Sequence, residues 1–366
     1  MSIDHETLRW NGWGHAAHKD ATEDREDVWA WLAAEFGMPS LLVTPARPLE
    51  EIALPASRLA ADDRSGLINI LGPDGLRDDP YQRAFHARGK SYHDLLHLRA
   101  GDLSTAPDAV LFPHSGDDVL AVLMLAHARN IAVVPYGGGT SVVGGVTGSK
   151  GPFKAVVALD LSAMDRLTDI DSISGTATAD AGISGPALEN ALAAKGMTLG
   201  HYPQSFEHST LGGWISHRGA GQQSSRYGKA EDWLISAKLA TPRGRFTTES
   251  FPASAAGPRL TDFVVGAEGA FGVITEATFR IRHRPQAREY CGFLFHDFQS
   301  GIAAIREAVQ AGLPVAMLRL SDSEETRFYR AFSAMGKRRG PSAWLADRYL
   351  KMRHFDAAAA AMIAGF

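Results

Sequence analysis

The feature that most constrains this chain is a run of three glycines soon after a short apolar segment. The segment 131–134 is apolar, and glycines occupy positions 137–139. Glycine weakens regular structure, but it tolerates a positive φ and lets other groups approach the backbone closely. Consecutive backbone N–H groups in such a loop can form an anion-binding nest, to which Thr140 and Ser141 would add hydroxyl donors. We interpret the loop as a cradle for a pyrophosphate; the alternative is a tight loop that joins two strands.

Two further glycine-rich stretches follow at wide spacing. In the stretch 209–215, Ser209 or Thr210 is expected to cap a helix whose first turn contains two glycines. A ligand could then lie on the helix N-terminus, although an ordinary capped helix packed on a sheet explains the pattern equally well. The stretch 266–274 precedes the clearest alternating strand pattern of the chain. Its glycines could present backbone amides to a flat ring, and a plain loop that enters the strand is the alternative.

From residue 108 onward, the hydrophobic pattern alternates between short apolar strands and amphipathic helices. Strands are expected at 109–112, 131–134, 155–161, 176–181, 234–241, 272–282, 292–295 and 315–320, and helices at 23–36, 117–129, 185–195, 298–311 and 323–332. An alanine-rich run at 357–361 is also expected to be helical. The pattern predicts an α+β protein with a mainly helical N-terminal segment (1–104), a larger domain (105–285) and a smaller α/β part (286–366).

Composition excludes several classes of protein. Lys and Arg number 37 and Asp and Glu number 41, so the net charge is −4. This balance argues against a nucleic-acid binder, which would need a clustered basic face. Cys291 is the single cysteine of the sequence, so an internal disulfide is excluded and a reducing compartment is expected. The sequence has no apolar run of membrane-spanning length and no signal-peptide pattern at its start, so we expect a cytoplasmic protein.

Several common site motifs are absent from the sequence. The dinucleotide fingerprint G-x-G-x-x-G, the phosphate loop G-x-x-x-x-G-K and the hydrolase elbow G-x-S-x-G find no complete match. His93 and His97 have the spacing of two metal ligands on a helix, but no third ligand is obvious. We expect both histidines on a solvated helix face and predict no metal site.

Taken together, the three glycine-rich stretches resemble the FAD-binding fold of the vanillyl-alcohol-oxidase/PCMH flavoprotein superfamily. The stretch 135–141 resembles its pyrophosphate loop, and 266–275 resembles its flavin-contacting EG-x-x-G-V-I-T segment. The Arg-Trp-Asn-Gly-Trp-Gly segment at 9–14 and the Ser-Thr-Leu-Gly-Gly-Trp segment at 209–214 narrow the resemblance to the alkyldihydroxyacetonephosphate synthases. The resemblance covers nearly the whole chain. It implies an α+β fold with a PCMH-type FAD-binding domain, made of two α/β subdomains, and a partial α/β cap domain.

The resemblance also implies which residues bind FAD. They are Pro135, Tyr136, Gly137, Gly138, Gly139, Thr140, Ser141, Gln204, Ser205, Phe206, Glu207, His208, Ser209, Thr210, His217, Arg218, Gly219, Ala220, Glu268, Gly269, Ala270, Phe271, Gly272, Val273 and Ile274. The family tends to have an acid at the position of Gln204 and an aromatic residue at that of His208. Covalent flavin attachment in the superfamily often uses a histidine of the pyrophosphate loop. Because none stands between Pro135 and Gly145, we expect non-covalent FAD.

The reaction that the resemblance implies is an exchange of the acyl group of acyl-dihydroxyacetone phosphate for a fatty alcohol. FAD would act as an electrophile, without net redox change. Arg319 matches an arginine near the family's active site; a surface arginine that ends a strand is the alternative. The far portion of the family's cap holds consecutive histidines and a catalytic tyrosine, whereas no two of the 14 histidines here are adjacent. We therefore expect a chain that is either truncated or has lost this chemistry, with apolar surface exposed on its partial cap.

Two other functions stay open. One is an FAD-linked 2-hydroxy-acid dehydrogenase or oxidase that acts on D-lactate or glycolate, and the other is a non-catalytic remnant of the FAD fold. The expected partner is a lipid-like small molecule or a 2-hydroxy acid. A homodimer stays open. Apolar substrates would suit peripheral contact with a membrane, but the sequence has no basic amphipathic helix strong enough to predict it. A β-branched side chain at Gly138 is expected to abolish FAD retention by blocking a positive φ and the approach of phosphate.

Overall fold

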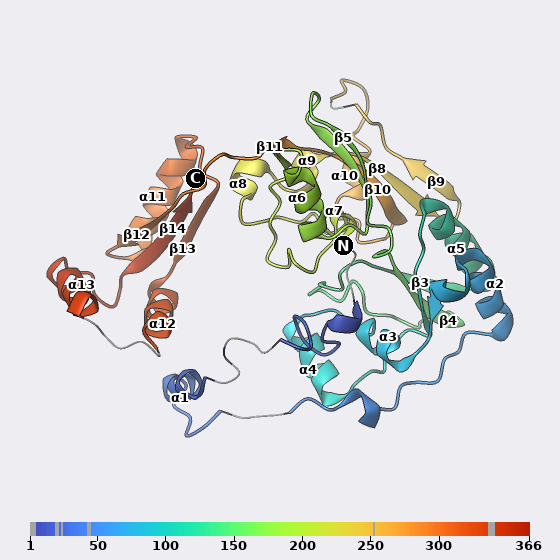
Figure 1. The fold of residues 1–366 in the computed structure, drawn as a ribbon, viewed down its shortest axis with the longest axis horizontal. Helices are drawn as coiled ribbons and strands as arrows, with labels where there is room; N and C mark the ends of the chain where they lie inside the picture. Colours follow the sequence, from blue (N-terminus) through green and yellow to red (C-terminus); the bar gives the residue numbers. More distant parts are fainter. Residues whose placement is uncertain (1–4, 19–21, 23–24, 42–44, 252, 336–340) are drawn as a thin grey trace. The chain divides into compact units, whose positions relative to one another are not determined.

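The computed structural model describes residues 5–18, 22, 25–41, 45–251, 253–335 and 341–366 (Figure 1). The chain divides into two compact units. The first comprises Met1–His18, Pro45–Gly221 and Tyr227–Arg284, and the second comprises Lys19–Thr44, Gln222–Arg226 and Pro285–Phe366. The boundaries after residues 104 and 285 that the sequence suggests stay predictions.

The first unit contains a four-stranded sheet with the order β1-β2-β4-β3. Its strands are β1 (Leu76–Arg77), β2 (Ala109–Leu111), β3 (Ile131–Tyr136) and β4 (Ala155–Asp160). β2, β4 and β3 are parallel, and β1 pairs with β2 in antiparallel fashion. Every residue of β4 is buried, as is typical of a parallel strand covered on both faces. The carboxyl ends of β3 and β4 meet at one edge of the sheet, where α/β sheets commonly bind ligands.

The helix between β2 and β3 is α5 (Gly116–Arg129), which begins and ends as its sequence predicts. The side chain of Ser115 accepts a hydrogen bond from the Asp118 N–H and caps its start, and Asn130 ends it with a left-handed φ of 57°. Its apolar face is buried, and α2 (Ala61–Leu71) packs against it.

The second sheet of this unit is antiparallel throughout, with the order β5-β6-β10-β8-β9. Its strands are β5 (Leu167–Asp171), β6 (Thr176–Asp180), β8 (Leu234–Thr241), β9 (Gly244–Thr247) and β10 (Val273–Arg280). The alternation predicted for β10 is confirmed from Thr275 onward, where buried residues alternate with less buried ones. One hydrophobic core contains Val157 and Leu159 of the first sheet together with Ala179 and Phe279 of the second.

The remaining elements of the first unit are short. They are the 3₁₀ turns His5–Thr7, Leu49–Glu51 and Pro73–Gly75, the helices α3 (Pro80–Phe85), α4 (Tyr92–Ala100), α6 (Gly185–Ala193), α7 (Leu211–Ser216), α9 (Ala230–Trp233) and α10 (Thr261–Val264), and the strands β7 (Met197–Thr198) and β11 (Arg282–His283). The helix α8 (Ser224–Tyr227) lies at a boundary between the units. As predicted, His93 and His97 are exposed on α4.

The second unit is built on a three-stranded sheet with the order β12-β14-β13. Its elements are α1 (Glu26–Glu35), β12 (Tyr290–Phe295), α11 (Phe298–Gln310), β13 (Met317–Ser321), α12 (Ser323–Ala334), α13 (Pro341–Met352) and β14 (Ala360–Gly365). β14 pairs in antiparallel fashion with both neighbours, so β12 and β13 are parallel but not adjacent. For α1, the predicted first residues 23 and 24 lie outside the described residues.

The helix predicted at 357–361 is wrong, because β14 begins there as a central strand. The Asp356 carboxylate accepts a hydrogen bond from the Ala358 N–H, which forms a turn. Ala360, Met362 and Ala364 then alternate as buried residues between two strands. Pairing on both sides therefore outweighs the helix propensity of alanine. No helix in the described ranges is both long and apolar enough to cross a membrane.

Candidate cofactor-binding site

The three glycine-rich stretches converge on one pocket of the first unit, of about 920 Å³ including its open mouth. The expected FAD-binding residues that line it are Pro135, Tyr136, Gly137, Gly138, Gly139, Thr140, Ser141, Ser209, Thr210, His217, Glu268, Gly269, Gly272, Val273 and Ile274. Lining residues outside the expected set are Gly145, Val146, Leu161, Ala181, Gly212, Gly213, Ser216, Leu239, Val264 and Ala267. Of these, Gly212, Gly213 and Ala267 belong to the glycine-rich stretches 209–215 and 266–274, and Ser216 directly precedes His217.

The glycine loop begins where β3 ends, and its glycines allow two segments to pack closely. A Cβ on Gly137 would overlap the Thr210 hydroxyl, and a Cβ on Gly138 would overlap the carbonyl oxygen of His208. A positive φ occurs at Gly139 (67°) and not at Gly138, which corrects the expected reason for a glycine at position 138. Gly138 is required because a neighbouring backbone approaches it.

The second stretch forms the predicted capped helix. The Thr210 hydroxyl accepts a hydrogen bond from the Gly213 N–H at 3.4 Å and caps α7. The Trp214 indole N–H donates to the Ser209 hydroxyl at 2.7 Å, which fixes the residue before the cap. The Gly212 N–H donates to the Ala181 carbonyl, so the start of α7 is held against the second sheet.

The third stretch is a loop that enters β10. Gly266, Glu268 and Gly269 all have a positive φ, and Glu268 does so without being a glycine (φ 45°). The Glu268 N–H donates to the Ser216 carbonyl at 2.9 Å, which joins this loop to the end of α7. Ala270 and Phe271 are exposed and do not line the pocket.

The other predicted residues do not line the pocket. Those residues are Gln204, Ser205, Phe206, Glu207, His208, Arg218, Gly219 and Ala220. The Arg218 guanidinium donates to the Val265 carbonyl at 3.1 Å and thereby supports the third loop. Direct contact of these residues with FAD stays a prediction.

Arg319 lies in the second unit, in the middle of β13 and not at its end. Its guanidinium donates to the Glu325 carboxylate at 2.9 Å and to the Tyr329 hydroxyl at 3.2 Å. Arg319 and Tyr329 are exposed and Glu325 is partly exposed, so the arginine is accessible to an anionic ligand. A catalytic role for Arg319 stays a prediction.

The electrostatics of the pocket fit a diphosphate held by neutral donors. The lining contains no lysine or arginine among the described residues. Over the same residues, the backbone N–H groups of Gly138, Gly139 and Thr140 have no protein acceptor. Unpaired backbone N–H groups in succession, together with loop hydroxyls, are the kind of donors that bind phosphate oxygens in a nest. Burial lowers the pKa of His217 against the opposing effect of Glu268, which favours a neutral imidazole at the rim.

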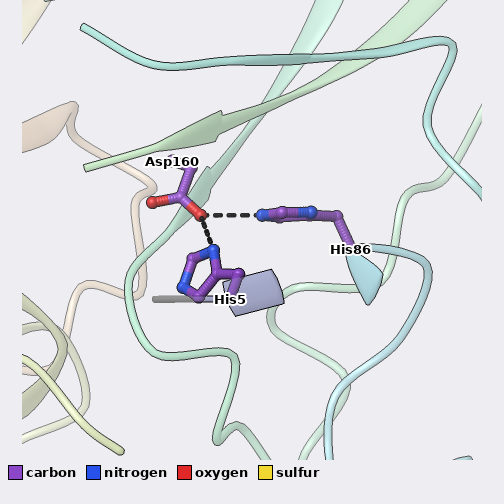
Figure 2. Close-up of side chains that lie close together, drawn as sticks. All are labelled: His5, His86 and Asp160. Carbon is purple, nitrogen blue, oxygen red and sulfur yellow. Dashed lines mark hydrogen bonds and ion pairs between the residues drawn. The ribbon is translucent and has the colours of Figure 1, made fainter. Parts of the chain in front are cut away.

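A buried cluster that the sequence analysis missed lies beside this loop. His86 Nε2 is 2.7 Å and His5 Nδ1 is 3.2 Å from the same Asp160 carboxylate oxygen (Figure 2). All three residues are buried, and Tyr136 packs on the His86 ring with 4.2 Å between centroids. The sequence does contain one indication of this cluster: Asp160 is a charged residue near the end of the apolar strand 155–161. An unpaired charge in a buried strand would be costly, so a partner was to be expected. Its partners come from distant parts of the sequence.

Family models match both units of the chain. Residues 107–250 match the FAD binding domain, and residues 284–362 match the C-terminal domain of FAD linked oxidases. Fold and site together define a PCMH-type FAD flavoprotein, which confirms the predicted fold class. FAD is its cofactor, and the glycine cradle fits the diphosphate of FAD.

Individual relatives narrow the assignment. The alkyldihydroxyacetonephosphate synthase of Trypanosoma brucei brucei is 33% identical over 90% of this chain and 56% of its own length. The enzyme of that name from Dictyostelium discoideum is 33% identical over 88% and 56%. A solved structure of an alkyldihydroxyacetonephosphate synthase superposes with a TM-score of 0.87 at 32% identity, covering 100% of this chain and 70% of that one. This chain belongs to the alkyldihydroxyacetonephosphate synthase family, and it spans about half the length of the curated relatives.

Proposed function

We propose that this protein uses FAD to make alkyldihydroxyacetone phosphate, the product for which its relatives are named. In the proposed reaction, a fatty alcohol and acyl-dihydroxyacetone phosphate give the alkyl ether and a free fatty acid. The C–O bond to the acyloxy group breaks, the alcohol oxygen forms the new C–O bond, and the proton of the alcohol goes to the acid. The observation that carries the proposal is the cradle at 137–141, whose backbone donors would hold a diphosphate without a lysine or arginine.

The residues of the first unit would bind and orient the cofactor. The N–H groups of Gly138, Gly139 and Thr140 would donate to phosphate oxygens, and the capped start of α7 would close the other side of the cradle. Gly269, Gly272 and Val273, at the start of β10, would support the flavin ring. When bound, FAD would supply an electrophilic centre that the side chains of this chain lack.

In the second unit, Arg319 supports the substrate side of the proposal. A guanidinium held by Glu325 and Tyr329 has a fixed orientation and keeps further N–H donors for a phosphate. The apolar side chains Tyr290, Phe293 and Ile363 on the same sheet are exposed. They suit a substrate with a long alkyl chain.

Two measurements test this proposal. The absorbance spectrum of the purified protein should show bound flavin, and acid precipitation should release it as FAD if attachment is non-covalent. Labelled fatty alcohol should then be incorporated into an ether product, with one fatty acid released per ether formed. A flavin-loaded protein that incorporates no label would refute the transferase assignment, whereas a protein that takes up no flavin would leave only a non-catalytic remnant of the fold.

The second candidate is an FAD-linked 2-hydroxy-acid dehydrogenase. It is favoured by the match of residues 284–362 to FAD linked oxidases and by weaker similarity to the glycolate oxidase subunit GlcD of Bacillus subtilis, 24% identical over 76% of this chain and 57% of that protein. Anaerobic addition of D-lactate or glycolate would bleach the flavin absorbance if this function is present. An unchanged spectrum would exclude it for these two acids.

The remaining partner assignments are also proposals. A lipid-like substrate favours transient contact with a bilayer, and co-sedimentation with anionic vesicles would detect it. Light scattering would separate a homodimer from a monomer. We also propose a cytoplasmic location, because the free thiol of Cys291 is exposed and suits a reducing compartment; cell fractionation tests it.

A further inference from the structure

The cluster of His5, His86 and Asp160 joins three distant parts of the first unit. His5 belongs to the N-terminal strap, defined here as residues 5–18, His86 directly follows α3, and Asp160 ends β4. Figure 2 shows both imidazole rings directing a nitrogen at one carboxylate oxygen, Oδ2 of Asp160. The other oxygen, Oδ1, accepts a hydrogen bond from the Ser162 N–H at 2.8 Å.

The hydrogen bonds of His86 indicate which of its ring nitrogens carry a proton. Its Nδ1 lies 2.7 Å from the Gln82 carbonyl oxygen, which can only accept, so Nδ1 carries a proton. Its Nε2 lies 2.7 Å from Asp160 Oδ2. Burial acts to raise the pKa of Asp160, but the two histidines outweigh it and hold the pKa well below its usual range. If the carboxylate is ionised, both ring nitrogens of His86 face an acceptor, Gln82 O and Asp160 Oδ2, and a doubly protonated ring satisfies both.

A metal ion explains this geometry less well than a proton does. Ligand atoms that lie about 2.0 Å from a tetrahedral zinc are about 3.3 Å apart, longer than the 2.7 Å between His86 and Asp160. The described residues offer three ligands here, whereas structural zinc sites usually have four. In addition, the ring plane of His86 is directed at the carboxylate oxygen itself (Figure 2).

The cluster lies next to the FAD-binding loop. Tyr136 is paired with Asp160 in the register of β3 and β4, and its ring packs on His86. A Cβ on Gly139 would overlap the Tyr136 hydroxyl, so this tyrosine directly supports the left-handed residue of the loop. His86 therefore contacts the Tyr136 ring, and the Tyr136 hydroxyl in turn contacts Gly139.

The N-terminal strap is fixed to the same loop at further points. The buried Lys90 ammonium donates to the carbonyls of Arg9 and Trp10, at 3.3 and 3.2 Å. The Lys90 backbone N–H donates to the Ser141 carbonyl at 2.8 Å. Leu8 and Trp13 of the strap line a small cavity together with Gly138 and His208. Through these contacts, displacement of the strap would disturb the loop.

We propose that His86 and Asp160 form a buried ion pair that His5 joins, and that this cluster fixes the N-terminal strap and the loop 136–141 in the geometry that retains FAD. His5, His86 and Asp160 are positioning residues and do not contact the cofactor. The inference rests on FAD binding by this loop and not on the proposed transfer reaction. Its tests therefore measure protonation and FAD dissociation instead of turnover.

The first test is selective ¹⁵N-histidine NMR near pH 7.5, with His86→Gln used for assignment. We expect both ring nitrogens of His86 to be protonated, in samples with and without chelator. A His86 ring with one bare nitrogen would overturn the ion pair. A spectrum that changes when chelator removes bound metal would overturn it in favour of a metal site.

The second test uses His5, because its substitution leaves the His86–Asp160 pair intact. His5→Phe keeps the ring that stacks on Phe85 at 4.7 Å but removes the N–H donor, whereas His5→Asn keeps a donor near Nδ1. We expect FAD to dissociate about ten times faster from His5→Phe than from the wild type. In His5→Asn, the logarithm of the dissociation rate should return at least half of the way to the wild-type value. The exposed His93→Phe is the matched control. Equal dissociation rates in the wild type and His5→Phe would overturn the proposal.

Discussion

The backbone of Gly138 lies against the carbonyl group of His208, with no room between them for a side chain. This contact brings the first and second glycine-rich stretches together, although 70 residues separate the two positions. The two closely packed backbones form the side of the pocket that would hold the diphosphate of FAD. The cradle is therefore a property of two segments and not of the glycine loop alone.

Gly138→Ala is expected to weaken FAD binding at least tenfold. The new methyl group would overlap a backbone oxygen, which cannot move like a flexible side chain, so the loop must shift. Fluorescence titration of the flavin-free protein with FAD measures the effect. Gly292→Ala is the control, because nothing lies within 4 Å of its Cβ position and its φ is not positive. FAD affinity unchanged by Gly138→Ala would place the diphosphate elsewhere.

Lys90 should make stability depend on pH in the alkaline range. Burial lowers its pKa to about 8, against the opposing effect of Asp94. The unfolded chain then binds more protons than the folded chain between about pH 8 and 10.5, so Lys90 makes stability rise with pH in that window. We expect the free energy of unfolding of the wild type, relative to Lys90→Met, to rise by about 2 kcal/mol from pH 7.5 to 9.5.

Urea unfolding of both proteins at the two pH values measures this difference. Lys195→Met, at an exposed position, is the control and should follow the wild type. If the difference in the free energy of unfolding between the wild type and Lys90→Met did not change with pH, the Lys90 ammonium would not be desolvated in the folded protein.

His201 should destabilise the protein in mild acid. Its side chain packs between Trp214 and Trp233, and neither ring nitrogen has a partner in the described structure. Burial lowers its pKa to about 4. Because the unfolded chain takes up the proton first, stability is lost as the pH falls from about 6.5 to 4.

His201→Phe removes this titration and keeps an aromatic ring between the tryptophans. The wild type should lose about 2 kcal/mol more stability than His201→Phe between pH 7 and 5, as measured by urea unfolding. The exposed His93→Phe should lose as much as the wild type. If His201→Phe lost as much stability as the wild type, the His201 ring of the folded wild type would already be protonated or hydrated.

Arg319→Met should remove substrate binding without affecting the cofactor. The guanidinium lies in the second unit, whereas the FAD cradle lies in the first. We expect normal flavin content, and loss of the spectral change that acyl-dihydroxyacetone phosphate, the proposed substrate, should cause in the bound flavin of the wild type. Arg306→Met, at an exposed position on α11, is the control. A full spectral response in Arg319→Met would assign this arginine to the surface ion pair with Glu325 alone.

The sequence by itself predicted the central strands of both sheets of the first unit, the longer helices α5 and α11, and the three parts of the cofactor cradle. Local rules suffice for these features, because apolar periodicity, helix caps such as Thr210 and glycine runs depend on neighbouring residues. The resemblance to a known family added the identity of the ligand. Local rules failed at 357–361, where alanines with helix propensity form the central strand β14.

Only the tertiary structure decided which residues need to be glycine and which charges are paired. Gly138 is constrained by His208, and the buried Asp160 carboxyl group is paired because His86 and His5 reach it from sequence positions far from its own. Such contacts join segments 70 or more residues apart, so no local pattern records them. Their physical basis is close packing and the cost of burying an unpaired charge, and both act only once the chain has folded.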